Sequence, residues 1–396
     1  MLRRSNFCWL WLGQTLIFSA SQFWFVALTW LVLQETHSGF AIGTVLMSAA
    51  VPRGLFMLVG GAMSDRFPTN AVATVATALN TVLVGAIALI LFFGTFQLGL
   101  VIGIAALFGL SEAFLYPAIL ALLPQIVKTP RLGEANAWMQ GSEQITNVVG
   151  PAAAGLVIGA LSLPIAFAIN TLLFALGGSC LCLIRIRSQS APVQSTPTTL
   201  ASDIREGLQY AWKQPAIRIS LLLIAMLNFA MLGPIVIGVA DMVATRFSGS
   251  ATTFGYLQSA YGIGALAGAL IAGRLSAVRD LQTPLVFLSY SLGAGLVLLG
   301  FVQQAWVAAV VIACMGIGGG IVGVLGLTWL QKQTAVQMQG RMMSLVMFAA
   351  IALDPFSQAI SGAFLEISLT GLFIAAGSIM LLTGFIASLS FPDRHR

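Results

Sequence analysis

Long apolar segments separated by short polar breaks run from one end of the chain to the other. An apolar helix of roughly 20 residues spans the hydrocarbon core of a bilayer, because a helix satisfies its own backbone groups inside lipid. The pattern therefore predicts an all-α polytopic membrane protein with twelve transmembrane helices. The predicted spans are 9–33, 40–63, 71–93, 98–123, 134–161, 164–184, 219–245, 253–273, 284–301, 306–330, 342–363 and 371–389.

The composition agrees with a membrane protein. Hydrophobic residues make up 58% of the 396 residues and charged residues only 8%, and the mean hydropathy is +0.96. Such a chain has too few polar residues to coat a soluble domain of this size. The net charge of +6 would point to nucleic acid only with a basic patch or arm, and the sequence has neither, so no nucleic-acid partner is expected.

Lysine and arginine lie almost entirely on one side of the predicted topology. Of the 18 basic residues, only Arg246 falls in a loop on the opposite side and only Arg53 falls inside a span. Because positive charge near the ends of spans is retained in the cytoplasm, both termini are expected to be cytoplasmic.

A hydrophilic stretch at 185–218 divides the spans six and six. Up to Leu200 it is rich in Ser, Thr, Pro and Gln, which is typical of a flexible linker, and an amphipathic helix is expected to follow. The expected organisation is an N-terminal half at 1–184, a cytoplasmic linker at 185–218 and a C-terminal half at 219–396.

Small residues recur at matching places in the two halves. Gly43 and Gly61 recur 212 residues later as Gly255 and Gly273. The repeat predicts two pseudo-symmetric halves of six helices each. Repeated halves that enclose a site near the membrane midplane are typical of secondary transporters.

The loop after the second span carries Gly61, three further residues, and then Asp65 and Arg66. This arrangement resembles the motif that the major facilitator superfamily carries between spans 2 and 3. We expect Gly61 to allow close helix approach and Asp65 to cap a facing helix, latching the halves on the cytoplasmic side. The glycine and basic pair that usually follow are absent, and the second-half copy lacks Asp-Arg, so a one-sided and weaker latch is predicted.

Two further resemblances concern export. Gly150, Pro151 and Gly155 in the fifth span resemble part of the motif of exporters in this superfamily. Segments 202–208 and 330–341 resemble the branch that contains bacterial enterobactin and macrolide efflux proteins. The resemblance implies the major facilitator fold, a place in the bacterial cytoplasmic (inner) membrane, a monomer, and a small amphipathic substrate.

Ionisable side chains inside a bilayer cost roughly 2.5 to 3.5 kcal/mol each, so each needs a partner or a function. The predicted spans contain five such residues: Arg53, Glu112, Glu143, Asp241 and Asp354. Glu112 lies near the middle of the fourth span, and the fold that the chain resembles lines its cavity with spans 1, 4, 7 and 10. Glu112 is therefore the first candidate for a carboxylate that carries protons or binds a cation. The alternative is a structural carboxyl group bonded to a neighbouring helix.

Other polar residues in the spans have weaker claims. Glu143 and Asn147 belong to a polar stripe on one face of the fifth span, which either lines water or forms a seam of hydrogen bonds. Further candidates for the cavity are Gln14, Gln22, Asn228 and Asp241. The alternative for the three amides is packing between helices, and for Asp241 a place near the outer end of its span, where water reaches it.

Arg53 and Asp354 lie at similar predicted depths, roughly 15 and 20 Å from the cytoplasmic ends of their spans at 1.5 Å per residue. In the fold that the chain resembles, spans 2 and 11 face each other across the boundary between the halves. A charge pair between the halves is therefore expected. The alternative is that each charge pairs within its own half.

The chain is not expected to be an enzyme. It has only two histidines, His37 in a loop and His395 in the tail, and no nucleotide-binding Gly-Lys-Ser/Thr loop. We expect no catalytic residues, cofactor or metal, and a proton gradient as the energy source for efflux by alternating access. The alternatives are an ion-coupled importer of a small nutrient and a non-transporting sensor or lipid-handling protein. An importer of a charged nutrient would favour opposite charges in the cavity spans, and spans 1 and 10 have none.

Overall fold

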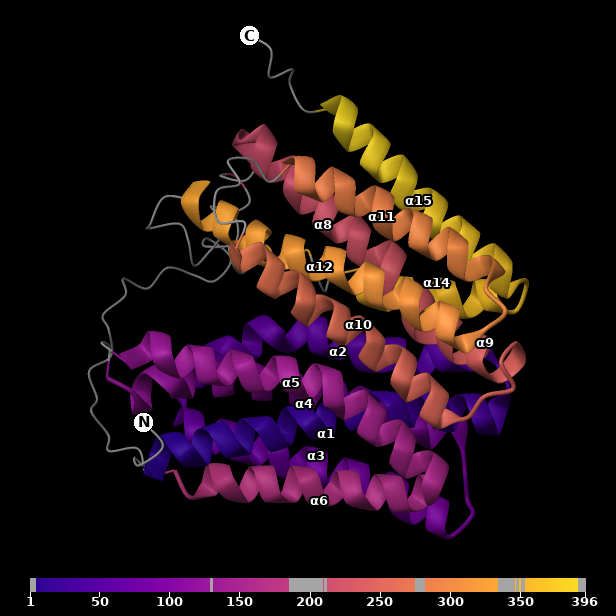
Figure 1. Ribbon diagram of the computed structural model, residues 1–396. Coiled ribbons are helices and arrows are strands. Elements are labelled where there is room, and N and C mark those ends of the chain that lie inside the picture. The colour runs from indigo at the N-terminus through magenta and orange to yellow at the C-terminus, as the bar shows by residue number, and fades with distance from the viewer. Residues whose placement is uncertain are drawn as a thin grey trace. The chain divides into compact units, whose positions relative to one another are not determined.

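The computed structural model is helical throughout the part of the chain that it describes (Figure 1). The described residues are 5–128, 131–184, 209, 212–274, 282–333, 346, 349 and 353–390. The chain forms two compact units, residues 1–188 with 239–259 and residues 189–238 with 260–396. Most of the expected linker at 185–218 lies outside the described residues.

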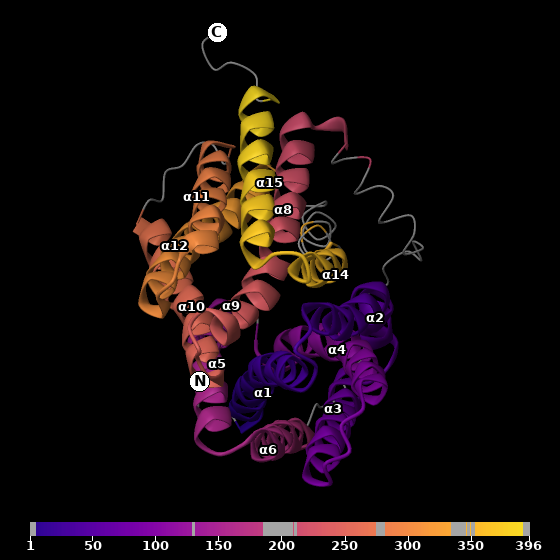
Figure 2. The ribbon, with the colours of Figure 1, turned by 90° about the vertical axis from the view of Figure 1, so that its right-hand side faces the viewer.

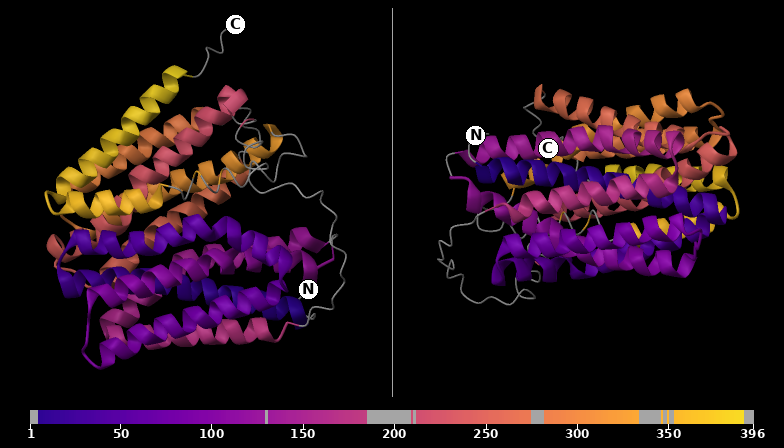
Figure 3. Two further views of the ribbon diagram at one scale, coloured as in Figure 1. Left: turned by 180° about the vertical axis from the view of Figure 1, so that it is seen from behind. Right: turned by 90° about the horizontal axis from the view of Figure 1, so that it is seen from below.

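The first unit contains six long helices, which run side by side (Figures 2 and 3). Their bounds are α1 Ser5–Thr36, α2 Gly39–Arg66, α3 Thr69–Phe92, α4 Leu98–Ile126, α5 Leu132–Ala160 and α6 Leu163–Cys182. Each contains one predicted span almost entirely, because the short polar breaks in the sequence are where the helices end. Helix α1 packs against α5 and α6, α3 packs against α4 and α6, and α2 packs against α4.

The remaining helices supply the second unit, except that α9 and the first residues of α10 cluster with the first. Their bounds are α8 Pro215–Gly233, the π-helix η2 Pro234–Gly238, α9 Val239–Thr245, α10 Ala251–Arg274, α11 Gln282–Phe301, α12 Ala305–Gln333, α14 Asp354–Leu365 and α15 Leu369–Ser390. Helix α8 packs against α14 and α15, and α11 packs against α12 and α15. These neighbours match those of α1 and α3 in the first unit, which confirms the pseudo-symmetry predicted from the sequence repeat.

Ten helical segments within the described residues are long and apolar enough to cross a membrane. Helix α5 is not among them because its polar stripe lowers its hydropathy. The predicted span at 342–363 lies partly outside the described residues, and the helix described within it is α14. The all-α polytopic architecture is confirmed, whereas the full number of twelve spans stays a prediction.

The predicted span at 219–245 contains a break that its hydropathy did not reveal. The helix becomes a π-helix at Pro234, which has no N–H group with which to continue the α-helical ladder. Ser357 of α14 bonds the backbone beside the break: its Oγ donates to the Phe229 carbonyl at 2.5 Å and accepts from the Gly233 N–H at 2.9 Å. A side chain from a neighbouring helix thus satisfies backbone groups where the ladder is interrupted.

Aromatic packing fixes α1 within the first unit. Trp24 stacks on Phe108 of α4 with ring centroids 4.3 Å apart, and it meets Phe167 of α6 edge to face at 6.0 Å. Phe108 in turn contacts Phe174 of α6 at 5.8 Å. These contacts hold α1 against α4 and α6.

Candidate functional site

The carboxyl group of Glu112 lies where polar side chains from neighbouring helices converge. Asn80 of α3 donates through Nδ2 to Glu112 Oε1 at 2.9 Å. Arg53 of α2 lies within electrostatic range of the same carboxyl group, and Ser21 of α1 approaches it without reaching hydrogen-bond geometry. Asn80 is fully buried and Glu112 is half-buried. The carboxyl group singled out in the sequence is therefore held by other helices of its own unit.

Asn80 is suited to a partner that changes its protonation state. Its Oδ1 has no hydrogen-bond partner among the described residues. An amide offers both a donor and an acceptor, so Asn80 can donate to a carboxylate and, after rotation, accept from a carboxylic acid. Either state of Glu112 can therefore keep a hydrogen bond at this position.

A second polar contact joins α1 to α5. Gln22 donates through Nε2 to Asn147 Oδ1 at 2.6 Å. Beside this bond, a Cβ at Gly150 would lie only 2.8 Å from Gln22 Cβ, so Gly150 lets the two helices approach. At Asn147 the polar stripe of α5 thus forms a seam between helices, one of the two roles expected of it.

Two aromatic contacts and a second carboxyl group lie along α1 between Trp11 and Phe18. Phe18 and Tyr116 lie 6.2 Å apart, centroid to centroid, and Glu143 of α5 lies within electrostatic range of the Tyr116 hydroxyl group. Trp11 and Trp138 meet edge to face at 6.0 Å. We call Trp11, Phe18, Tyr116, Trp138 and Glu143 the aromatic cluster. Its rings and carboxyl group come from α1, α4 and α5.

The remaining amides and Asp241 have different surroundings. Gln14 is 2% exposed, and its Oε1 has no hydrogen-bond partner among the described residues. Asn228 donates to the Ile224 carbonyl of its own helix at 2.9 Å. Asp241 lies in the first turn of α9, directly after the π-helix, and is half-buried.

Arg53 has two candidate partners. The sequence suggests Asp354, which is 7% exposed in the first turn of α14 and belongs to the other unit. The structure of the first unit adds Glu112, whose carboxyl group lies within electrostatic range of Arg53. The pair with Asp354 stays a prediction, and the two partners do not exclude each other.

We expect a double-mutant cycle on the melting temperature of the purified protein to reveal the partner of Arg53. Removing one member of a buried charge pair typically costs about 3 to 5 kcal/mol, and removing both often costs less. Arg53→Gln combined with Glu112→Gln should therefore destabilise less than the sum of the single changes. The same cycle with Asp354→Asn tests the pair between the units. Additive losses in both cycles would show that neither carboxyl group is a partner.

The loop motif after the second span is only partly described. A Cβ at Gly60 would meet the Ala113 carbonyl of α4, whereas a Cβ at Gly61 would meet no described atom within 4 Å. Within this unit a close helix approach occurs at Gly60, and the approach expected at Gly61 stays a prediction. The side chains of Asp65 and Arg66 lie outside the described residues, so the latch stays a prediction.

The exporter-type motif lies in a tight contact between α5 and the first turns of α10. A Cβ at Gly155 would meet the Ala251 carbonyl and would lie 3.1 Å from the Cα atoms of Thr252 and Gly255. Thr252 Oγ1 donates to the Gly155 carbonyl at 3.0 Å. We call this contact the α5–α10 seam. Its backbones are so close that Gly155 has no room for a side chain.

The family follows from the comparison of the whole chain with known families. A family model described as "Major Facilitator Superfamily" matches residues 10–350. The chain belongs to the major facilitator superfamily. This membership agrees with the duplicated six-helix pattern, and it confirms the resemblance that the motifs indicate.

The relatives of the chain within the superfamily include efflux pumps. It is 27% identical over 395 residues to an uncharacterised MFS-type transporter of Sinorhizobium fredii, covering 96% of this chain and 93% of that protein. It is 25% identical over 376 residues to the multidrug efflux pump Tap of Mycolicibacterium fortuitum, covering 91% and 90%. The solved structure of the nucleoside transporter NupG matches with a TM-score of 0.79 at 12% identity, covering 98% of this chain and 100% of that one. At that identity the structural match concerns the fold alone.

Sequence reasoning missed Asn80 as a partner of Glu112. The signal was present, because a lone amide inside an apolar span is costly unless another polar group satisfies it. Phe18, Trp11 and Trp138 were missed for a different reason. Aromatic residues are frequent in apolar helices of this chain, so only their contacts distinguish them.

Proposed function

We propose that this protein exports amphipathic small molecules across the bacterial cytoplasmic membrane in exchange for protons, by alternating access. The observation that carries the proposal is the contact of Glu112 with Asn80, 2.9 Å long and inside an apolar helix bundle. Membership of a transporter superfamily and relatives that include a multidrug efflux pump support it.

Glu112 is the proposed proton carrier. Removal of water disfavours the charged form of a carboxyl group, whereas a nearby guanidinium group and an amide N–H favour it. Glu112 experiences all three influences, from its helix bundle, from Arg53 and from Asn80. When the transporter alternates between states that admit and exclude water, the balance between the charged and neutral forms of Glu112 changes. The proton is then taken up or released.

The aromatic cluster is the proposed binding site for the cargo. Aromatic faces together with a carboxylate attract amphipathic molecules that carry positive charge. Glu143 supplies that charge close to Phe18 and Tyr116. The proposed cargo is therefore an apolar molecule with a cationic group. The carboxylate that attracts it, Glu143, differs from the one that carries the proton, Glu112.

The proposed orientation has both termini in the cytoplasm. It rests on the basic residues, of which Arg246 is the one that falls in an outer loop. In this orientation α1 ends at the outer face, and the Gly61, Asp65 and Arg66 motif lies at the cytoplasmic face. The proposed working unit is a monomer.

Accumulation of a compound panel tests this function. Cells that lack their own exporters and express this protein should accumulate less of at least one class among lipophilic cations, macrolides and siderophores. A protonophore should restore accumulation to the level of cells without the protein, because export then has no driving force. Reduced accumulation that survives the protonophore would contradict proton coupling, and increased accumulation would indicate import.

A further inference from the structure

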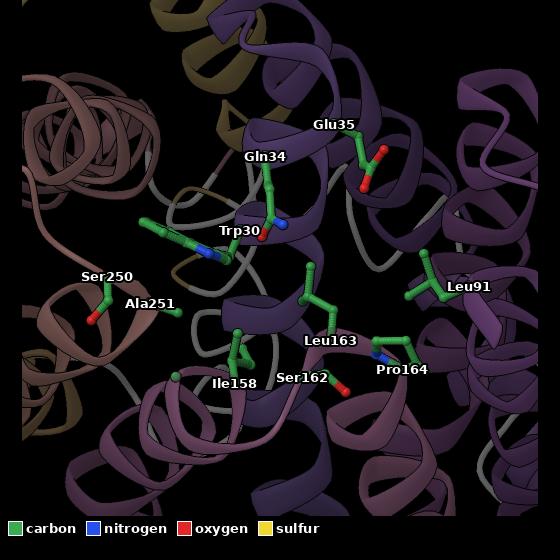
Figure 4. Close-up of a pocket in the computed structure, with 11 residues that line it drawn as sticks. Trp30, Gln34, Glu35, Leu91, Ile158, Ser162, Leu163, Pro164, Ser250 and Ala251 are labelled. Carbon is green, nitrogen blue, oxygen red and sulfur yellow. The ribbon is translucent and has the colours of Figure 1, made fainter. Parts of the chain in front are cut away.

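A cavity of about 340 Å³ lies in the first unit, where α1 ends, α5 gives way to α6, and α10 begins (Figure 4). It is remote from Glu112. Glu35 lines the cavity from the last turn of α1, fourteen residues beyond Ser21, which corresponds to roughly 21 Å along a helix. In the proposed orientation the cavity is at the outer face. The cavity is thus separate from the site around Glu112, and it offers a second place where a small molecule can be held.

The lining of the cavity suits a positively charged aromatic or amphipathic molecule. Trp30 forms one wall, and its ring stacks on Phe254 with centroids 6.2 Å apart and an interplanar angle of 23°. Glu35 is the one charged side chain among the described lining residues. The Trp30 ring and the Glu35 carboxylate leave different sides of α1 (Figure 4). An aromatic face and a carboxylate each attract cations. Ser162 and Ser250 add neutral hydroxyl groups at the cavity wall.

The cavity also adjoins the α5–α10 seam. Gly159 and Ala251 line the cavity, and both take part in the contact between the two helices. A Cβ at Gly159 would meet Thr252 Oγ1, and a Cβ at Gly155 would meet the Ala251 carbonyl. The cavity wall therefore includes residues from both sides of the seam.

We propose that this cavity is a release subsite for small organic cations at the outer end of the export route. Its place on that route rests on the proposed function. The cavity volume is at the lower end of the range for small-molecule sites, about 300 to 1,000 Å³, and so fits a cation of one or two rings. Glu35 is exposed, and water weakens the attraction of an exposed carboxylate, which suits a site that must let its ligand go.

Protection of an introduced cysteine tests the site. Ser162→Cys is placed in the full chain with its four native cysteines replaced by alanine, and the purified protein is reconstituted in lipid nanodiscs. The rate of alkylation by iodoacetamide is measured with and without 1-methyl-4-phenylpyridinium. We expect this cation to slow the reaction at least fivefold and its neutral analogue 4-phenylpyridine, at pH 8, to leave the rate unchanged.

Two charge-removing variants complete the test. Glu35→Gln should abolish the protection, whereas Glu134→Gln, which removes an exposed carboxylate at the other end of α5, should preserve it. Absence of protection in the parent protein, or protection that survives Glu35→Gln, would overturn the proposal. Nanodiscs carry no ion gradient, so the result does not depend on export. Protection in a protein that fails to export would reject the proposed function and still support the site.

Discussion

Replacement of Glu112 by Gln is expected to abolish uphill efflux while leaving ligand binding largely unchanged. Glutamine is close in size to glutamate and can still bond with Asn80, but it cannot take up or release a proton. Efflux against a concentration gradient should fall to the level of protein-free vesicles when a pH gradient is imposed on proteoliposomes. Equilibrium dialysis of the same variant with the transported compound should give an affinity within about threefold of wild type, a difference of about 0.7 kcal/mol.

Matched variants separate this role from a structural one. Glu112→Asp keeps a titratable group and should retain part of the uphill efflux. Glu134→Gln removes an exposed carboxylate at the beginning of α5 and should transport like wild type. Wild-type efflux in Glu112→Gln would show that this carboxyl group is not the proton carrier.

Replacement of Gly155 by Leu should reduce transport at least tenfold. A Cβ at this position would meet the backbone of α10, including the Ala251 carbonyl, so the two helices must separate to admit any side chain. Inserting extra atoms into a well-packed contact typically costs about 1 to 3 kcal/mol. The loss should appear as a lower transport rate and a lower melting temperature of the purified protein. Gly155→Ala should lie between wild type and Gly155→Leu in both measurements.

Gly141 provides the control on the same helix. It is exposed, and a Cβ there would meet no described atom within 4 Å, so a side chain introduced at this position does not start against a neighbouring backbone. Gly141→Leu should keep the transport rate and melting temperature of wild type. Equal behaviour of the two leucine variants would contradict a tight α5–α10 seam.

Much of the fold could be predicted from the sequence because a bilayer demands long apolar helices. The predicted span at 98–123 lies within α4, Leu98–Ile126, and the predicted span at 134–161 differs from α5 by two residues at most. The π-helix at Pro234–Gly238 could not be predicted in this way. Hydropathy averages over about twenty residues and does not register where single backbone hydrogen bonds are lost.

The carboxyl group of the candidate site could be predicted from the sequence, whereas its hydrogen-bond partners could not. The insertion cost of a charge drew attention to five residues, and the fold that the chain resembles placed Glu112 first among them. Its bond to Asn80 depends on how α3 packs against α4, and the bond from Gln22 to Asn147 depends on how α1 packs against α5. Such contacts join residues far apart in the chain, and one sequence carries no direct record of them. The close approach of Gly60 to α4 likewise depends on helix rotation.

Ligand-driven proton movement tests the central claim, proton exchange through Glu112, most directly. Purified protein is reconstituted in vesicles that contain a pH-sensitive dye, with the membrane potential clamped by potassium and valinomycin. A transported, permanently charged cation is then added outside. We predict that the cation enters as protons leave, so the lumen becomes alkaline in wild-type vesicles and stays unchanged in Glu112→Gln vesicles. Entry of the cation without a pH change in wild type, or an equal pH change in both proteins, would contradict the account.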